Sequence, residues 1–222
     1  MKIFATFLQV ATVAIVAAVS LAHAQELCGP GEYQRTIQCS IEYTCTGYTF
    51  TCPVEITYCC IWDASRGTNI ARIEQIVVYE QTCFIHLYGC GALEVGGAFW
   101  NGVSECVGED LQNCWGDYPP CDSSTSITYE VWTAQCQRIE NREVMPGDFA
   151  DVIIPCSWQN RCYRKYQACY DFSTFPPTLV VRELERGVDG PPQCSTTVPP
   201  IPPPGKQWNE HWITPCFAPC SP

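Results

Sequence analysis

The chain has 222 residues, of which 18 are cysteines, and it carries 23 acidic residues against 12 basic ones. The formal net charge of −11 excludes nucleic acids and anionic membrane surfaces as main partners, because such a surface repels phosphates. A chain of this length can bury a normal hydrophobic core, so disulfide bonds would supplement that core and would not replace it.

The first 24 residues predict a cleavable signal peptide. A positive start is followed by a long apolar run, which ends in the A-x-A cleavage pattern Ala22-His23-Ala24. The alternative is an uncleaved membrane anchor, but the two small residues favour cleavage between Ala24 and Gln25. We therefore expect a secreted or periplasmic protein that has no membrane span after cleavage, because no other apolar run is long enough.

The even number of cysteines in an exported chain predicts up to nine disulfide bonds. A structural zinc site would need C-x2-C or C-x4-C pairs with matching ligands, and the sequence has neither, so we expect no metal and no cofactor. The disulfide candidates are Cys28, Cys39, Cys45, Cys52, Cys59, Cys60, Cys83, Cys90, Cys106, Cys114, Cys121, Cys136, Cys156, Cys162, Cys169, Cys194, Cys216 and Cys220.

Residues 25–83 predict a first β unit. Val54, Ile56 and Tyr58 alternate with polar residues, which is the period of a half-buried strand. Adjacent Cys59 and Cys60 must point to opposite faces of such a strand, so we expect them to bond to different partners.

Residues 84–126 differ from the first unit in composition. Seven glycines lie from Gly89 to Gly116, and four of the cysteines fall within residues 84–126. This pattern predicts a glycine-rich, disulfide-stapled insertion without helices. His86 lies in an apolar run, which favours a packed strand residue over a catalytic base.

Residues 127–194 predict a second β unit, in which Ile127, Tyr129 and Val131 alternate with polar residues. The one weak indication of a helix covers residues 182–186. The T-x-Q-C sequence at residues 36–39 recurs at residues 133–136.

The spacing of cysteines also recurs between the two units. Cys52 and Cys59 match Cys162 and Cys169, and Cys83 matches Cys194 with a shift of one residue. These matches predict two degenerate β repeats in an all-β, disulfide-rich fold. Coincidence in a cysteine-rich chain is the alternative, and equivalent bridging of equivalent cysteines would test it.

The C-terminal region begins with a proline-rich linker, residues 195–207, which predicts an extended polyproline II spacer. Residues 208–222 follow and contain Cys216 and Cys220. These two cysteines favour a clamp bridged back to the body over an exposed tail.

Acidic residues gather in one part of the chain, because no Lys or Arg occurs from Ile73 to Gln137. Solvated surface charge is favoured over a calcium site, since the ordered D-x-[DN]-x-[DN]-G loop is missing. Farther along, Arg161, Arg164 and Lys165 lie close together. This asymmetry would support head-to-tail self-association.

No catalytic motif is evident, and the catalytic residues, if any, are unknown. A glycan-acting hydrolase would need two carboxylates, with tryptophans to stack on sugar rings, and the sequence offers Glu105, Glu109, Asp110 and Asp117 near Trp100 and Trp115. By elimination, the sequence favours a secreted, non-enzymatic structural or binding protein of the cell exterior with an extracellular protein or glycan partner. The alternatives are that hydrolase and a protein-binding inhibitor or effector.

Overall fold

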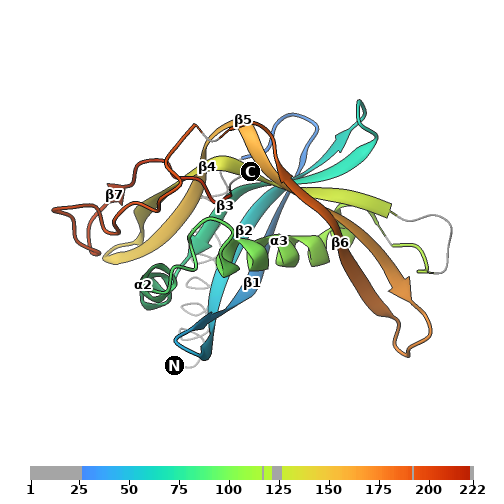
Figure 1. The fold of residues 1–222 in the computed structure, drawn as a ribbon, viewed down its shortest axis with the longest axis horizontal. Helices are drawn as coiled ribbons and strands as arrows, with labels where there is room; N and C mark the ends of the chain where they lie inside the picture. Colours follow the sequence, from blue (N-terminus) through green and yellow to red (C-terminus); the bar gives the residue numbers. More distant parts are fainter. Residues whose placement is uncertain (1–26, 117, 122–126, 192, 221–222) are drawn as a thin grey trace, which may run out of the picture.

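The computed structural model describes residues 27–116, 118–121, 127–191 and 193–220. The predicted signal peptide and its cleavage point between Ala24 and Gln25 lie outside the described residues. The described chain forms one curled, mostly antiparallel sheet with helices on one face (Figure 1).

The first three strands form a meander of antiparallel neighbours: β1 (Tyr33–Cys45), β2 (Tyr48–Asp63) and β3 (Thr68–Val78). The alternating pattern in β2 has the predicted consequence, because Val54 and Ile56 are completely buried. Glu55 between them is half-buried, but Thr57, the next polar residue of the pattern, is buried as well.

The second half of the chain forms another meander: β4 (Ile127–Met145), β5 (Asp148–Asp171) and β6 (Thr178–Val188). The weak helix prediction for residues 182–186 is wrong, because these residues pair with β5 throughout. The short strand β7 (Trp212–Ile213) pairs with β4.

Strand β3 joins the two meanders into one sheet. Its residues Asn69–Arg72 pair with β4 in parallel, and its residues Ile76–Val78 pair with β5 antiparallel. The β4–β5 ladder changes register between these two regions. The hydrogen-bonded sheet is therefore continuous, and the main hydrophobic core draws residues from both meanders.

The region between the meanders contains helices, so the prediction of an insertion without helices is wrong. The helices are α2 (Gln81–Gly89), α3 (Ala98–Asp110) and α4 (Gln112–Trp115). His86 accordingly lies on α2 and not on a strand, although it is packed as expected. Its Nδ1 lies 2.8 Å from the hydroxyl of Tyr43.

The glycines of α3 explain why the sequence suggested a loop. A Cβ atom at Gly102 would lie 2.8 Å from Cγ2 of Ile41 on β1, which is too close for two carbon atoms. Glycine at position 102 therefore allows α3 to pack closely on β1. The buried side chains of α3 follow helical spacing and include Trp100, Val103 and Val107.

All 18 cysteines form disulfide bonds, and no free cysteine remains. The nine bridges are Cys28–Cys59, Cys39–Cys106, Cys45–Cys90, Cys52–Cys83, Cys60–Cys114, Cys121–Cys169, Cys136–Cys194, Cys156–Cys216 and Cys162–Cys220.

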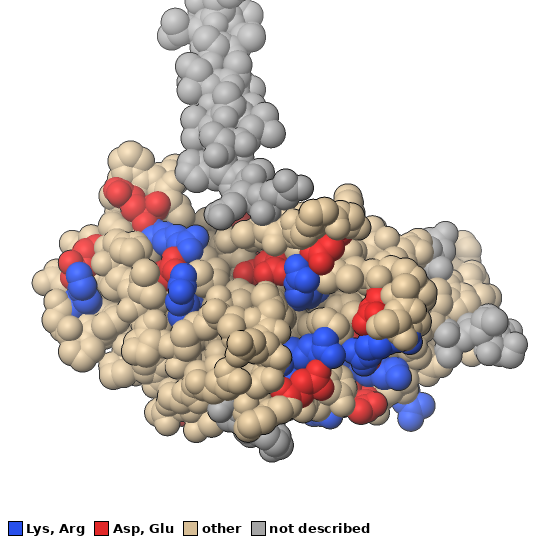
Figure 2. All heavy atoms as spheres, turned by 90° about the horizontal axis from the view of Figure 1, so that it is seen from above, with Lys and Arg blue, Asp and Glu red and all other residues tan. Residues whose placement is uncertain are grey.

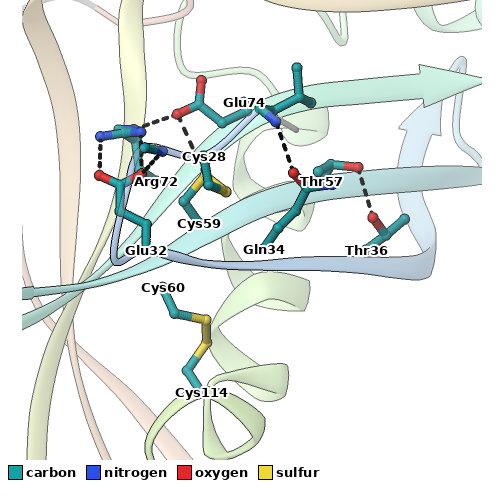
Figure 3. The surroundings of a disulfide bond; sticks show 12 residues. Cys28, Glu32, Gln34, Thr36, Thr57, Cys59, Cys60, Arg72, Glu74 and Cys114 are labelled. Carbon is teal, nitrogen blue, oxygen red and sulfur yellow. Dashed lines mark hydrogen bonds and ion pairs between the residues drawn. A yellow bond between two sulfur atoms is a disulfide. The ribbon is translucent and has the colours of Figure 1, made fainter. Parts of the chain in front are cut away.

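Adjacent Cys59 and Cys60 take different partners on opposite faces of β2, as the strand geometry predicted (Figure 3). Cys60 bonds to Cys114 of α4 on the helical face. Cys59 bonds to Cys28 on the other face, where Arg72 forms ion pairs with Glu32 and Glu74.

Each of the two meanders has three strands, but their disulfide bonds are not equivalent. Cys52 pairs with Cys83, whereas its proposed counterpart Cys162 pairs with Cys220 and not with Cys194. The structure therefore does not confirm the internal duplication.

The C-terminal segment is a clamp, since Cys216 and Cys220 both bridge to β5. The proline-rich stretch is not the stiff spacer that we expected. It bends at residues 201–202, and Ile201 is buried in the main core. The stretch therefore packs along the body and leads the chain to the clamp.

Candidate functional site at the β5–β6 hairpin

The β5–β6 hairpin extends beyond the helices and ends away from the body of the molecule (Figure 1). Strand β5 is braced close to the turn of this hairpin by the Cys121–Cys169 bridge. Two backbone hydrogen bonds of 2.9 Å add to this brace, from the amide of Tyr170 to the carbonyl of Pro119 and from the amide of Cys121 to the carbonyl of Tyr170. The end of the hairpin, residues 171–178, thus lies next to a cross-linked part of β5, and we call it the hairpin tip.

Short-range hydrogen bonds order the tip itself. The carboxylate of Asp171 accepts a hydrogen bond of 2.8 Å from the amide of Ser173. The hydroxyl of Thr174 lies 2.9 Å from that of Thr178 and donates to the carbonyl of Asp171. Hydrogen bonds from Ser173 favour the charged carboxylate and lower the pKa of Asp171. The turn is consequently held in shape at neutral pH.

The ordered tip presents apolar side chains to solvent. Phe172 is 61% exposed and Phe175 is 101% exposed. Val180 and Leu184 on the adjoining strand β6 are also exposed. Single exposed apolar residues are ordinary on protein surfaces, but two phenylalanines on one braced turn supply rigid contact area at a low cost in side-chain entropy.

The carboxylates that suggested a hydrolase do not form a free catalytic pair. Asp110 lies 2.9 Å from Nε of Arg35 and accepts a hydrogen bond of 2.6 Å from the hydroxyl of Tyr58. Glu105 and Glu109 are exposed on α3, and Asp117 lies outside the described residues. The arrangement therefore offers no support for acid–base catalysis by these groups.

The two tryptophans considered for sugar binding belong to the body of the protein. Trp100 is buried, and its indole nitrogen donates a 2.9 Å hydrogen bond to the carbonyl of Leu93. Trp115 is half-buried and packs against the core. Neither presents a free ring face beside a pair of carboxylates.

Several acidic residues of the span 73–137 are paired with arginines from elsewhere in the chain. Besides the pair at Asp110, Glu74 pairs with Arg72, and Glu130 lies 2.8 Å from Arg66. These partners explain part of the charge that the sequence left unbalanced.

Two groups of three metal-ligating side chains occur among the described residues. They are Cys45 with His86 and Cys90, and Cys28 with Glu32 and Cys59. In each group both cysteines are joined in a disulfide bond, so their thiolates are not available to a metal ion.

The basic residues of the second half of β5 lie on both faces of the strand. Arg161 stacks on Trp132, with its guanidinium carbon 3.5 Å from the ring centroid, and pairs with Asp189 at 2.6 Å. Arg164 faces the helices and pairs with Glu183, whereas Lys165 lies opposite Glu185. In the view of Figure 2, positive side chains gather on the side of the molecule where β5 and β6 lie, and negative side chains lie among them. The region is basic but already partly paired.

Comparison of the chain with protein-family models, with curated proteins and with solved structures found no match. In the part of the chain that the structure describes, no helix is both long and apolar enough to span a membrane. The case for function therefore depends on the geometry of this chain alone.

Proposed function

We propose that this protein is exported, is non-enzymatic, and binds another extracellular protein by inserting the hairpin tip into an apolar pocket of that partner. The observation that carries the proposal is the exposure of Phe175 on a turn that is braced by a disulfide and by its own hydrogen bonds. Nine disulfides are consistent with an oxidising compartment outside the cytosol.

The order of the hairpin tip lowers the free-energy cost of binding. Ordering a flexible loop at an interface reduces affinity, and a loop that is already ordered avoids that cost. Aromatic anchors in desolvated pockets dominate the energetics of many interfaces. The tip combines both properties, which supports the inhibitor or effector alternative over a glycan-acting hydrolase.

A photo-crosslinking experiment tests this proposal. A benzophenone amino acid replaces Phe175 in the full chain, and the labelled protein is irradiated with the surface and medium of the cells that produce it. The matched control carries the same group at Tyr48, which is 71% exposed at the turn between β1 and β2. We expect a discrete protein adduct from position 175 and none from position 48.

Competition makes the result specific. Excess wild-type protein should suppress the adduct, whereas a double variant with Phe172→Ser and Phe175→Ser should not. Equal adducts from both positions, or equal competition by both proteins, would contradict the proposal. Tip-dependent binding to neutral lipid vesicles would contradict it as well, because the partner would then be a membrane.

A further inference from the structure

A separate groove lies on the helical face of β4, β5 and β6. It has a volume of about 460 Å³ and is closed by the start of α3 on one side and by the C-terminal clamp at Pro219 and Cys220 on the other. Helix α3 packs mainly on β1 through Gly102 and the Cys39–Cys106 bridge. The helix therefore leaves this part of the sheet uncovered.

The floor and walls of the groove are mostly apolar, although Ser104 and Thr133 also line it. They include Val131 of β4, Val188 of β6 and the Cys162–Cys220 bridge. Trp100 forms part of the wall, and the hydrogen bond from its indole nitrogen to Leu93 holds its ring in place. Both the size and the lining resemble those of pockets that bind small organic molecules.

Two arginines lie at the rim of the groove, where their mutual repulsion favours the binding of a negatively charged group. Arg164 of β5 lies directly opposite Arg186 of β6, and like charges in this position destabilise a sheet. Both contact one carboxylate, because Glu183 lies 3.3 Å from Nη1 of Arg164 and 2.6 Å from Nε of Arg186. Two guanidinium groups thus share a single negative charge.

The other acidic residues of this hairpin region are engaged elsewhere. Glu185 accepts a hydrogen bond of 2.8 Å from the hydroxyl of Tyr163, and Asp189 pairs with Arg161. Among the described residues, neither Arg164 nor Arg186 forms an ion pair except with Glu183. The rim of the groove therefore keeps a net positive charge in a protein whose formal net charge is −11.

We propose that this groove binds a small carboxylic acid with an apolar body. The carboxylate would accept hydrogen bonds from Arg186, which is 65% exposed, and from the less exposed Arg164. The apolar body would lie along Trp100, Val131 and Val188. Planar guanidinium groups match carboxylates geometrically, and such charge-assisted hydrogen bonds are strong. This site is distinct from the hairpin tip, and the two proposals stand independently.

Calorimetry with the full, oxidised protein tests the groove. Dodecanoate is the probe, and dodecanol is its neutral counterpart, both below the concentrations at which they aggregate. We expect the wild-type protein to bind the acid at least tenfold more tightly than the alcohol. Similar affinities for the two probes, or no binding of the acid, would overturn the proposal.

Three variants locate the interaction. Arg186→Gln should weaken binding of the acid about tenfold and leave that of the alcohol unchanged, while Glu183 keeps its contact with Arg164. Arg182→Gln removes an equal charge from an exposed position on the same strand, outside the groove, and should have little effect. Val188→Trp should fill the groove and abolish binding of both probes.

Contrary results would be equally clear. Equal losses from Arg186→Gln and Arg182→Gln would show general electrostatic attraction and would overturn the assignment of Arg186. Unchanged binding in the Val188→Trp variant, with its disulfides and circular dichroism intact, would place the probe elsewhere on the protein. Loss of acid binding in the Phe175→Ser variant would contradict the independence of groove and tip.

Discussion

The two halves of the molecule use their disulfide bonds differently. Five bridges lie within Cys28–Cys114, and four lie within Cys121–Cys220, so no bridge joins the halves. In the first half, bridges attach α3 and α4 to β1 and β2. In the second half, they attach segments without regular structure to strands.

The two halves use their bridges differently because a sheet attaches its own strands but not the segments packed against it. Strands are held by their ladders, whereas helices and irregular segments contribute no hydrogen bonds to the ladder and need other attachment. The first half uses the attachment to cover its sheet with helices. The second half uses it to secure a clamp that forms one side of the groove and to brace the β5–β6 hairpin. The candidate functional surfaces accordingly lie in the second half.

The largest expected effect comes from removing one bridge in each half. Cys39 and Cys106 are 67 residues apart, and Cys156 and Cys216 are 60 residues apart, so loop entropy assigns each bridge about 4 kcal/mol. We expect the variant Cys39→Ser/Cys106→Ser to lose about this much unfolding free energy, because α3 loses its covalent attachment to the sheet.

The corresponding variant Cys156→Ser/Cys216→Ser should lose less, about 3 kcal/mol, because the intact Cys162–Cys220 bridge already confines the same segment to a loop of about ten residues. Denaturant unfolding measures both losses, and hydrogen exchange shows whether residues 208–220 open locally. Equal losses in the two variants would break the proposed difference between the halves.

A buried acid in the second half gives the next largest effect. The side chain of Asp151 is completely buried, and neither of its carboxylate oxygens has a hydrogen-bond partner among the described residues. Burial raises the pKa of this carboxyl from 3.8 to about 7. The folded protein therefore holds a proton that the unfolded chain releases near pH 4.

The sign of the pH dependence follows from this difference. The contribution of Asp151 to stability is complete below pH 4, falls as the pH rises from about 4 to 7, and is constant above pH 7. The Asp151→Asn variant should remove this slope and raise the unfolding free energy at pH 8 by up to about 4 kcal/mol, since the shift of about three pKa units corresponds to about 1.4 kcal/mol per unit. Urea titrations of both proteins at pH 5 and pH 8 measure the effect. An unchanged slope in the variant would show that Asp151 is not the responsible group.

The strands were predictable because their signal is local. The alternation at Val54 and Ile56 reports burial directly, whereas the one at Tyr129 and Val131 does not, because Glu130 between them is also buried. Strand geometry alone also predicted that Cys59 and Cys60 form disulfide bonds with different partners. In contrast, the disulfide partners depend on how distant segments meet, and the spacing of cysteines suggested a repeat that the bridges do not show.

The candidate site could not be found in the same way. The arginine that neutralises Asp110 lies 75 residues away in sequence, so an unpaired acid and a paired one look alike. The exposure of Phe172 and Phe175 depends on the hairpin extending past the helices. A sequence signal did exist, because Phe172 and Phe175 lie just before Pro176 between two strand patterns, and such a turn places its side chains outside the sheet.

A matched pair of glycines tests how α3 is held on the first half, with the smallest expected effect. Replacing glycine with alanine within a helix ordinarily stabilises it by about 0.5–1 kcal/mol. At Gly108 the new Cβ would lie 3.8 Å from the nearest atom, which is an ordinary contact, so Gly108→Ala should show this gain. At Gly102 it would lie 2.8 Å from Ile41, so Gly102→Ala should instead cost about 1–2 kcal/mol through overpacking. Thermal unfolding of both variants measures the opposite signs. If both substitutions stabilise the protein, close contact with β1 does not hold α3, and the bridge at Cys106 must hold the helix instead.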